Sequence, residues 1–73
     1  MKQYEVLAVL NGSVVCIRKR FLSRTRAINY MLRYYEDHYI YSFQIEEEIP
    51  VEKHKIEYVC DNYNRFTVKR VIA

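Results

Sequence analysis

The sequence predicts an α+β fold in which five strands and one helix follow the order ββαβββ. Three observations predict it: an Asn-Gly pair between two alternating apolar runs, one amphipathic helical stretch, and further alternating runs in the C-terminal half. A chain of 73 residues has the length of one small domain. We therefore expect residues 1–73 to form a single two-layer domain, with a five-stranded, mostly antiparallel sheet and the helix packed on one face.

The first two strands are predicted at about residues 3–10 and 13–21, with Asn-Gly at positions 11 and 12 between them. This pair favours a type I′ hairpin turn, because both central positions of that turn need φ > 0. A two-residue loop sets Leu10 opposite Ser13 and fixes the register by counting outward. On the face that carries Gln3 and Glu5, this register gives two cross-strand pairs: Glu5 with Arg18, and Gln3 with Arg20.

The same register predicts two faces of the hairpin with different surroundings. The face expected toward the helix carries Tyr4, Val6, Ala8, Leu10, Val15 and Ile17. The face away from the helix carries an apolar patch, made of Leu7, Val9, Val14 and Cys16. An outer sheet face is ordinarily polar, so this patch is a candidate protein interface, either for a partner or for a second copy packing sheet to sheet.

A helix is predicted at about residues 24–38, with Ser23 as its N-cap. At 100° per residue the helix has one broad apolar stripe, and we expect that stripe to cover one face of the sheet. The stripe contains Ala27, Ile28, Met31, Leu32, Tyr35, His38 and Tyr39. Tyr30 and Tyr34 lie on its shoulder.

The third and fourth strands are predicted at about residues 41–48 and 53–60, joined by a turn at residues 49–52 that contains Pro50. Counting outward from that turn places three apolar or aromatic pairs on one face and two ion pairs on the other. The pairs are Ile45 with Ile56, Phe43 with Tyr58, Tyr41 with Cys60, Glu48 with Lys53, and Glu46 with Lys55.

The fifth strand is predicted at about residues 65–72, after a turn at residues 61–64. An even-length loop would set Tyr58 against Thr67 and mismatch the apolar faces of the two strands. We therefore predict an odd-length loop or a bulge, with Asn62 or Asn64 at positive φ.

Charge is segregated along the chain, although the net charge is only +3. Residues 1–35 carry seven cations and one acid, whereas residues 36–61 carry eight acids and two cations. Residues 62–73 add three cations. The two signs are therefore expected to form separate patches, unless the third and fourth strands fold back beside the helix start.

The basic part of the chain is rich in arginine around the second strand and the helix start. Arg24 and Arg26 lie in the first helical turn, where the helix dipole disfavours cations. Arginine suits phosphate and carboxylate recognition, so a surface for nucleic acid or for an acidic partner is predicted. Its candidate residues are Arg18, Arg20, Arg24, Arg26, Arg33, Tyr30 and Tyr34. The alternative is a solvated rim without a ligand.

No pattern in the sequence points to an enzyme. There is no Gly-rich phosphate loop, no nucleophile motif and no metal-ligand spacing, and Cys16 and Cys60 are expected to be free thiols. We therefore expect no catalytic residue, no cofactor or metal, and no small-molecule substrate. No apolar run approaches the roughly 20 residues of a membrane span, and no signal-peptide pattern is present, so we expect a cytoplasmic protein without a membrane partner.

Two functions from different classes remain. The first is a small non-catalytic protein-interaction module, acting as an adaptor, an inhibitor or a homodimer through the outer sheet face. The second is nucleic-acid binding through the arginine-rich surface, with Tyr30 and Tyr34 stacking on bases. In size and tyrosine-rich composition the chain resembles accessory proteins of bacteriophages and other mobile elements, and that resemblance implies a host protein as the partner.

Overall fold

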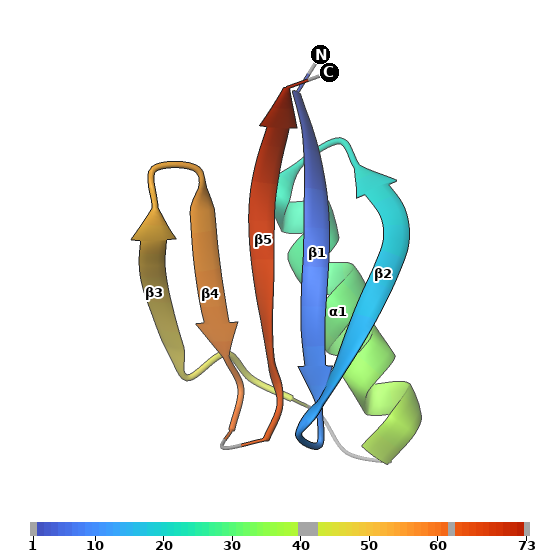
Figure 1. Cartoon of the computed structure of the whole chain (residues 1–73). Coiled ribbons are helices and arrows are strands. Elements are labelled where there is room, and N and C mark those ends of the chain that lie inside the picture. The colour runs from blue at the N-terminus through green and yellow to red at the C-terminus, as the bar shows by residue number, and fades with distance from the viewer. Residues whose placement is uncertain (1, 40–42, 62, 73) are drawn as a thin grey trace.

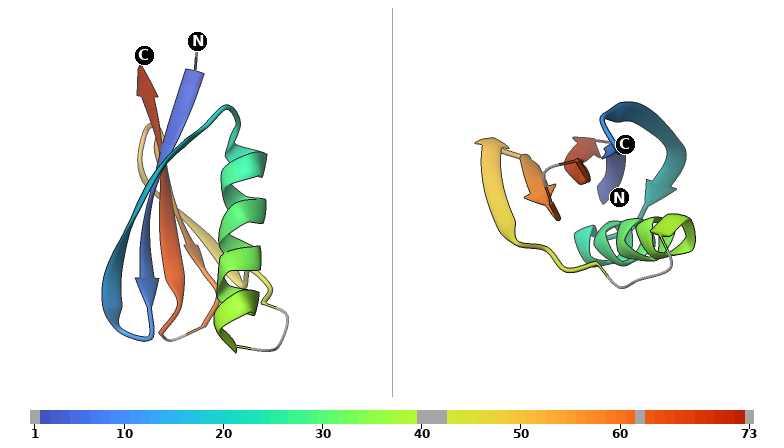
Figure 2. Two further views of the ribbon diagram at one scale, coloured as in Figure 1. Left: turned by 90° about the vertical axis from the view of Figure 1, so that its right-hand side faces the viewer. Right: turned by 90° about the horizontal axis from the view of Figure 1, so that it is seen from below.

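The computed structural model describes residues 2–39, 43–61 and 63–72 and confirms the ββαβββ order. All strands belong to one antiparallel sheet with the order β2-β1-β5-β4-β3 (Figure 1). The helix lies on one face of that sheet (Figure 2). The elements are β1 Lys2–Leu10, β2 Ser13–Phe21, α1 Arg24–Tyr39, β3 Glu47–Glu52, β4 Lys55–Val59 and β5 Arg65–Ile72.

The β1–β2 turn has the geometry that its sequence predicts. Asn11 has a φ of 51° and Gly12 a φ of 83°, so both central residues occupy the left-handed region that a type I′ turn needs. The predicted register is confirmed from the Leu10–Ser13 pair to the Val6–Ile17 pair. Turn chemistry alone therefore fixes most of this hairpin.

Beyond Val6 the register shifts, and the predicted pairing of Glu5 with Arg18 is wrong. Tyr4 pairs with Phe21, so residues 18–20 of β2 span Glu5 alone in a bulge. Arg20 is instead the partner of Glu5, with Nη2 lying 2.8 Å from Oε1, and it also donates to Gln3 Oε1 at 3.2 Å. The predicted register would set Phe21 opposite Lys2, whereas the bulge buries Phe21 and leaves the three basic residues in solvent.

The helix begins where its cap predicts, because Ser23 Oγ accepts a hydrogen bond from the backbone N–H of Arg26 at 3.2 Å. Ala27, Met31 and Tyr35 form the buried stripe, and each is 0% exposed. His38 was predicted on this stripe but is exposed, since Nδ1 donates to the Tyr34 carbonyl oxygen at 2.8 Å and the ring stays on the helix surface. Among the described residues the helix packs against β1, β2 and β5 and not against β3 or β4.

A buried tyrosine ties the helix to the middle of the sheet. The Tyr35 hydroxyl lies 2.7 Å from the carbonyl oxygen of Arg65 and 3.0 Å from that of Val9, and it donates its hydrogen to them. Val9 and Arg65 are paired residues of β1 and β5. One helical side chain therefore bonds to the main chain of two neighbouring strands.

The third strand differs most from its prediction. Residues 43–46 are not a strand, β3 runs from Glu47 to Glu52, and β4 begins at Lys55 rather than at residue 53. Pro50 therefore lies inside β3, and the chain turns at residues 53–54. The predicted pairs are replaced by Glu47 with Val59, Glu48 with Tyr58, Ile49 with Glu57, Pro50 with Ile56, and Glu52 with Lys55. The prediction for Tyr41 lies outside the described residues.

Two physical reasons account for the difference. β3 is an edge strand, and there a proline loses no hydrogen bond that the ladder needs. Phe43 and Ile45 do alternate with exposed residues, as predicted, but they pack against the core from a segment that connects the helix to β3 (Figure 2). Their alternation therefore reflects which side chains are buried, and it does not indicate that the segment pairs as a strand.

The β4–β5 connection has the predicted odd length. Val59 pairs with Arg65, which leaves five residues in the loop and keeps the apolar faces aligned. Asn11 is the only non-glycine with positive φ in residues 2–39, 43–61 and 63–72, so positive φ at Asn64 is wrong, and Asn62 lies outside these ranges. The loop is closed instead by Asp61, whose Oδ1 accepts the backbone N–H groups of Tyr63 and Asn64 at 2.8 and 2.7 Å.

Candidate interaction surfaces

The predicted apolar residues of the hairpin lie side by side on the sheet face away from the helix. Leu7 pairs with Cys16, and Val9 pairs with Val14. Leu7 is 47% and Val14 is 66% exposed, Cys16 is exposed, and Val9 is half-buried. We refer to these four residues as the outer patch. Such a contiguous exposed apolar surface is the ordinary sign of a binding face.

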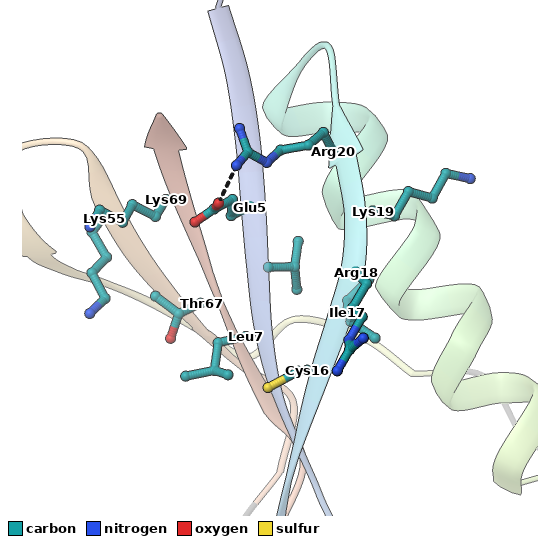
Figure 3. Close-up of a pocket in the computed structure, with 11 residues that line it drawn as sticks. Glu5, Leu7, Cys16, Ile17, Arg18, Lys19, Arg20, Lys55, Thr67 and Lys69 are labelled. Atoms are coloured by element: carbon teal, nitrogen blue, oxygen red, sulfur yellow. Dashed lines mark ion pairs between the residues drawn. The ribbon is translucent and has the colours of Figure 1, made fainter. Parts of the chain in front are cut away.

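The outer patch continues into a hollow of about 560 Å³ on the same face, which we call the outer hollow (Figure 3). Leu7, Cys16 and Thr67 line it between two sets of cations. The bulge of β2 contributes Arg18, Lys19 and Arg20, and the middle of the sheet contributes Lys55 and Lys69. Of the described residues, Glu5 is the one acid that lines this hollow, and it is already paired with Arg20.

A second hollow of about 510 Å³ lies between the end of β2 and the flank of α1, and we call it the helix-side hollow. Four cations line it together with one amide and three apolar or aromatic side chains. These residues are Lys19, Arg20, Arg26, Arg33, Asn29, Phe21, Leu22 and Tyr30. Lys19 and Arg20 line both hollows, so the basic bulge of β2 separates them.

The structure divides the predicted arginine-rich surface into three parts. Arg20, Arg26, Arg33 and Tyr30 meet in the helix-side hollow, and Arg18 lines the outer hollow. Arg24 lies apart from both. Its guanidinium is 5.5 Å from the centre of the Tyr4 ring, and its Nη1 is buried with no hydrogen-bond partner among the described residues. The contact with Tyr4 offsets the unfavourable position of Arg24 in the first helical turn.

The two tyrosines predicted to stack on bases already contact other side chains. Lys19 Nζ lies 4.9 Å from the centre of the Tyr30 ring, and Phe21 packs on that ring at 5.2 Å. Tyr34 lies 6.4 Å from Tyr30 and 4.5 Å from His38, measured between ring centres. A base that stacked on either ring would have to compete with these contacts, which weighs against stacking as a binding mode.

Sequence reasoning missed Lys55 and Lys69 as members of the basic surface, and it left Lys19 out of the candidate residues although Lys19 lies between Arg18 and Arg20. Lys55 and Lys69 are paired residues on β4 and β5, and only the strand order brings them toward the β1–β2 hairpin. The basic triplet of residues 18–20, opposite a single glutamate, was the available signal for the bulge.

Three acidic residues gather toward the other edge of the sheet. Glu46, Glu47 and Asp61 line a third hollow beside Val59, at the start of β3. None of these three acids lines the outer hollow or the helix-side hollow. Burial, together with the charges of Asp61 and Glu46, raises the pKa of the Cys60 thiol to about 11, so this thiol is neutral and a poor nucleophile.

Among the described residues, no three side chains of His, Cys, Asp or Glu are grouped in a way that would hold a metal ion. In those same parts of the chain, the helix is neither long nor apolar enough to cross a membrane. Comparison with protein-family models, with curated proteins and with solved structures finds no match to this chain.

Proposed function

We propose that this chain is a small non-catalytic protein-interaction module, an adaptor or inhibitor, that binds its partner through the outer face of the β1–β2 hairpin. One observation carries the proposal. The outer patch shares Leu7 and Cys16 with a hollow lined by five cations. An exposed apolar surface beside a basic one fits a partner surface of opposite charge that also offers apolar contacts. The likeness in size and composition to phage accessory proteins favours a host protein as that partner.

The charge of the surface favours a different protein over a second copy. The two copies of a homodimer built on this face would bring their basic hollows toward each other, which opposes association at low salt. An acidic partner gains affinity from the same charges. Size-exclusion chromatography with light scattering tests the dimer, and a concentration-independent monomer mass is the expected result.

The decisive experiment pairs two identical substitutions at opposite edges of the sheet. Val14→Glu changes the outer patch, and Val51→Glu changes an exposed valine of β3 that is 48% exposed. A protein captured from a bacterial lysate by the wild-type chain is purified and titrated against both variants. We expect Val14→Glu to weaken binding by about tenfold or more, a loss of roughly 1.4 kcal/mol, and Val51→Glu to leave it within about twofold. Equal affinities for the two variants would contradict the proposal.

A second function, nucleic-acid binding, is favoured by the helix-side hollow, where Arg26, Arg33 and Lys19 converge beside Tyr30. Phosphates bound there would give an affinity that falls steeply with salt. Labelled single- and double-stranded oligonucleotides test this function at low salt. Binding that is lost in Arg26→Glu and Arg33→Glu but kept in Val14→Glu would support it, and no binding by the wild-type chain would exclude it.

A further inference from the structure

The two edges of the sheet differ in how they resist pairing with another strand. β3 contains Pro50, several acids and an irregularity between Pro50 and Glu52, all of which block strand addition. β2 carries its cations and its bulge only beyond Ile17. From Ser13 to Ile17 it pairs regularly with β1 and contains no charge and no proline. This half of β2 is an open edge next to the outer patch.

Hairpin geometry determines which main-chain groups of this edge are available. A two-residue turn is closed by a hydrogen-bonded pair, here Leu10 and Ser13, and hydrogen-bonded pairs then alternate with non-bonded ones. Val14 and Cys16 therefore belong to non-bonded pairs. Their N–H and C=O groups point away from β1, toward the open edge. An added strand would meet these groups first.

The two hollows continue the same edge toward the basic bulge. A strand laid along β2 sends alternate side chains to the outer face and to the helix side. On the outer face they reach Arg18 and Arg20, and on the helix side they reach Arg26 and Arg33. Both faces of the added strand would therefore meet cations at this end. Carboxylates on both faces are the complementary chemistry.

We infer that the partner contributes an extended acidic segment that adds to the sheet as a strand along β2. The inference rests on the proposed function and specifies its binding mode. Apolar or threonine residues of the segment lie beside Val14 and Cys16 of the outer patch. Its acidic residues lie beside the bulge at residues 18–20, between the two hollows. Main-chain hydrogen bonds provide affinity, and the charges select an acidic sequence.

A second copy of this chain is a poorer occupant of the edge. Pairing of β2 with β2 joins two basic edges, which repel at long range. Pairing of β2 with β3 brings acids to the bulge, but Pro50 lacks the N–H that the middle of such a strand requires. Self-association through β2 would therefore contradict the inference.

Short synthetic peptides test the mode directly on the wild-type chain. One peptide places a run of glutamates before alternating threonine and valine, a second reverses that order, and a third scrambles the composition. We expect one ordered peptide to bind about tenfold more tightly than the scrambled one, with an affinity that falls as salt rises. Which order binds reports whether the added strand runs parallel or antiparallel to β2. Equal affinities of the three peptides would overturn the inference.

N-methylation of the better peptide separates strand addition from simple charge attraction. Methyl groups on one alternate set of amides block the hydrogen bonds to β2, whereas methyl groups on the other set point to solvent. We expect one methylated peptide to lose binding by about tenfold or more and the other to keep it within about threefold. Equal effects of the two methylation patterns would overturn the inference, since a surface that reads only charge does not distinguish them.

A matched pair of protein variants completes the test. Cys16→Pro removes a main-chain donor that faces the open edge and leaves the ladder with β1 intact, whereas Cys16→Ala removes only the thiol. Cys16→Ala also changes the outer patch, to which the thiol belongs, so the two variants are compared with each other. Peptide binding should be about tenfold weaker in Cys16→Pro than in Cys16→Ala. The purified partner could bind Cys16→Pro normally and yet fail to bind Val14→Glu. In that case the outer face is the interface, but no strand is added to β2. The proposed function then stands and this inference falls.

Discussion

The hairpins at the two edges of the sheet, β1–β2 and β3–β4, reach their registers by different means. In β1–β2 the left-handed conformations of Asn11 and Gly12 set the register from the turn outward. In β3–β4 the turn at residues 53–54 has no residue at positive φ, and the strand runs through Pro50. Buried side chains therefore have to position the second hairpin. A turn that requires positive φ values constrains the register of a hairpin more strongly than the alternation of apolar residues does.

The largest expected effect concerns the packing that positions β3. Phe43 is only 7% exposed and lies 5.5 Å from Tyr35 between ring centres, although it belongs to no strand. Phe43→Ala should lower the free energy of unfolding by about 3 kcal/mol, through lost burial and the cavity that remains. Denaturant unfolding measures the loss. Tyr63→Ala removes an aromatic ring that is 63% exposed, and it should cost less than about 0.5 kcal/mol.

A similar loss in both variants would mean that Phe43 does not anchor the segment. The register of β3–β4 would then have to come from the strand pairing itself. In that case the two hairpins would be specified by the same kind of local information.

The next effect compares the two turns. Gly12 has a φ of 83°, where a Cβ is strained although no atom lies within 4 Å of it. Gly12→Ala should therefore cost about 1 kcal/mol of unfolding free energy through backbone strain alone. Lys53→Ala changes the other turn and should stay within about 0.5 kcal/mol, because that turn needs no left-handed residue. Thermal unfolding of the two variants side by side measures the difference. Equal shifts of the melting temperature would show that neither turn constrains its hairpin more strongly than the other.

This contrast explains which parts of the fold follow from the sequence. The Asn-Gly pair, the Ser23 cap and the 3.6-residue period of the helix are local signals, and each of them is confirmed. The strand at residues 41–48 was predicted because apolar or aromatic residues at 41, 43 and 45 alternate with polar residues at 42, 44 and 46. Alternating burial also arises in a segment that crosses under a sheet, and the sequence does not separate the two cases.

The candidate surface shows the same division between features that local sequence signals predict and features that depend on tertiary packing. The outer patch depends on the β1–β2 register, so its four residues were placed correctly next to one another. The basic hollows depend on the bulge at residues 18–20 and on the strand order, which brings Lys55 and Lys69 across the sheet. Both are outcomes of tertiary packing, and the bulge goes with the burial of Phe21. A count of charges along the chain identified the basic region but not its shape.

A smaller effect concerns the bulge itself. The Glu5–Arg20 ion pair is 2.8 Å long, but the two side chains are 46% and 54% exposed. Glu5→Gln should therefore cost less than about 0.5 kcal/mol at low salt and nothing measurable at high salt. Denaturant unfolding at both ionic strengths measures this. A loss that persists at high salt would mean that the pair, rather than the burial of Phe21, holds the bulge in place.

The smallest expected effect concerns the hydrogen bonds that join the β1–β2 turn to the β4–β5 loop. The N–H of Asn11 donates to Asn64 Oδ1 at 3.1 Å, and Asn64 Nδ2 in turn donates to the Asp61 carboxylate at 3.0 Å. Burial acts to raise the pKa of Asp61, but hydrogen bonds from Asn64 and from the N–H of Tyr63 outweigh it and lower the pKa from 3.8. The β3–β4 turn is held by a strand instead, because the N–H of Arg70 in β5 donates to the carbonyl oxygen of His54 at 2.8 Å.

A carboxyl whose pKa is lower in the folded than in the unfolded state stabilises the fold above its unfolded pKa. This contribution is present at pH 7 and is lost as the pH falls below 3.8 through the folded pKa. Because the group is close to solvent, the change should be small. Asp61→Asn should flatten this part of the curve of unfolding free energy against pH, measured from pH 7 downward in denaturant. An unchanged slope between the two proteins would mean that the β1–β2 turn stands without the neighbouring loop, and that its register comes from Asn11 and Gly12 alone.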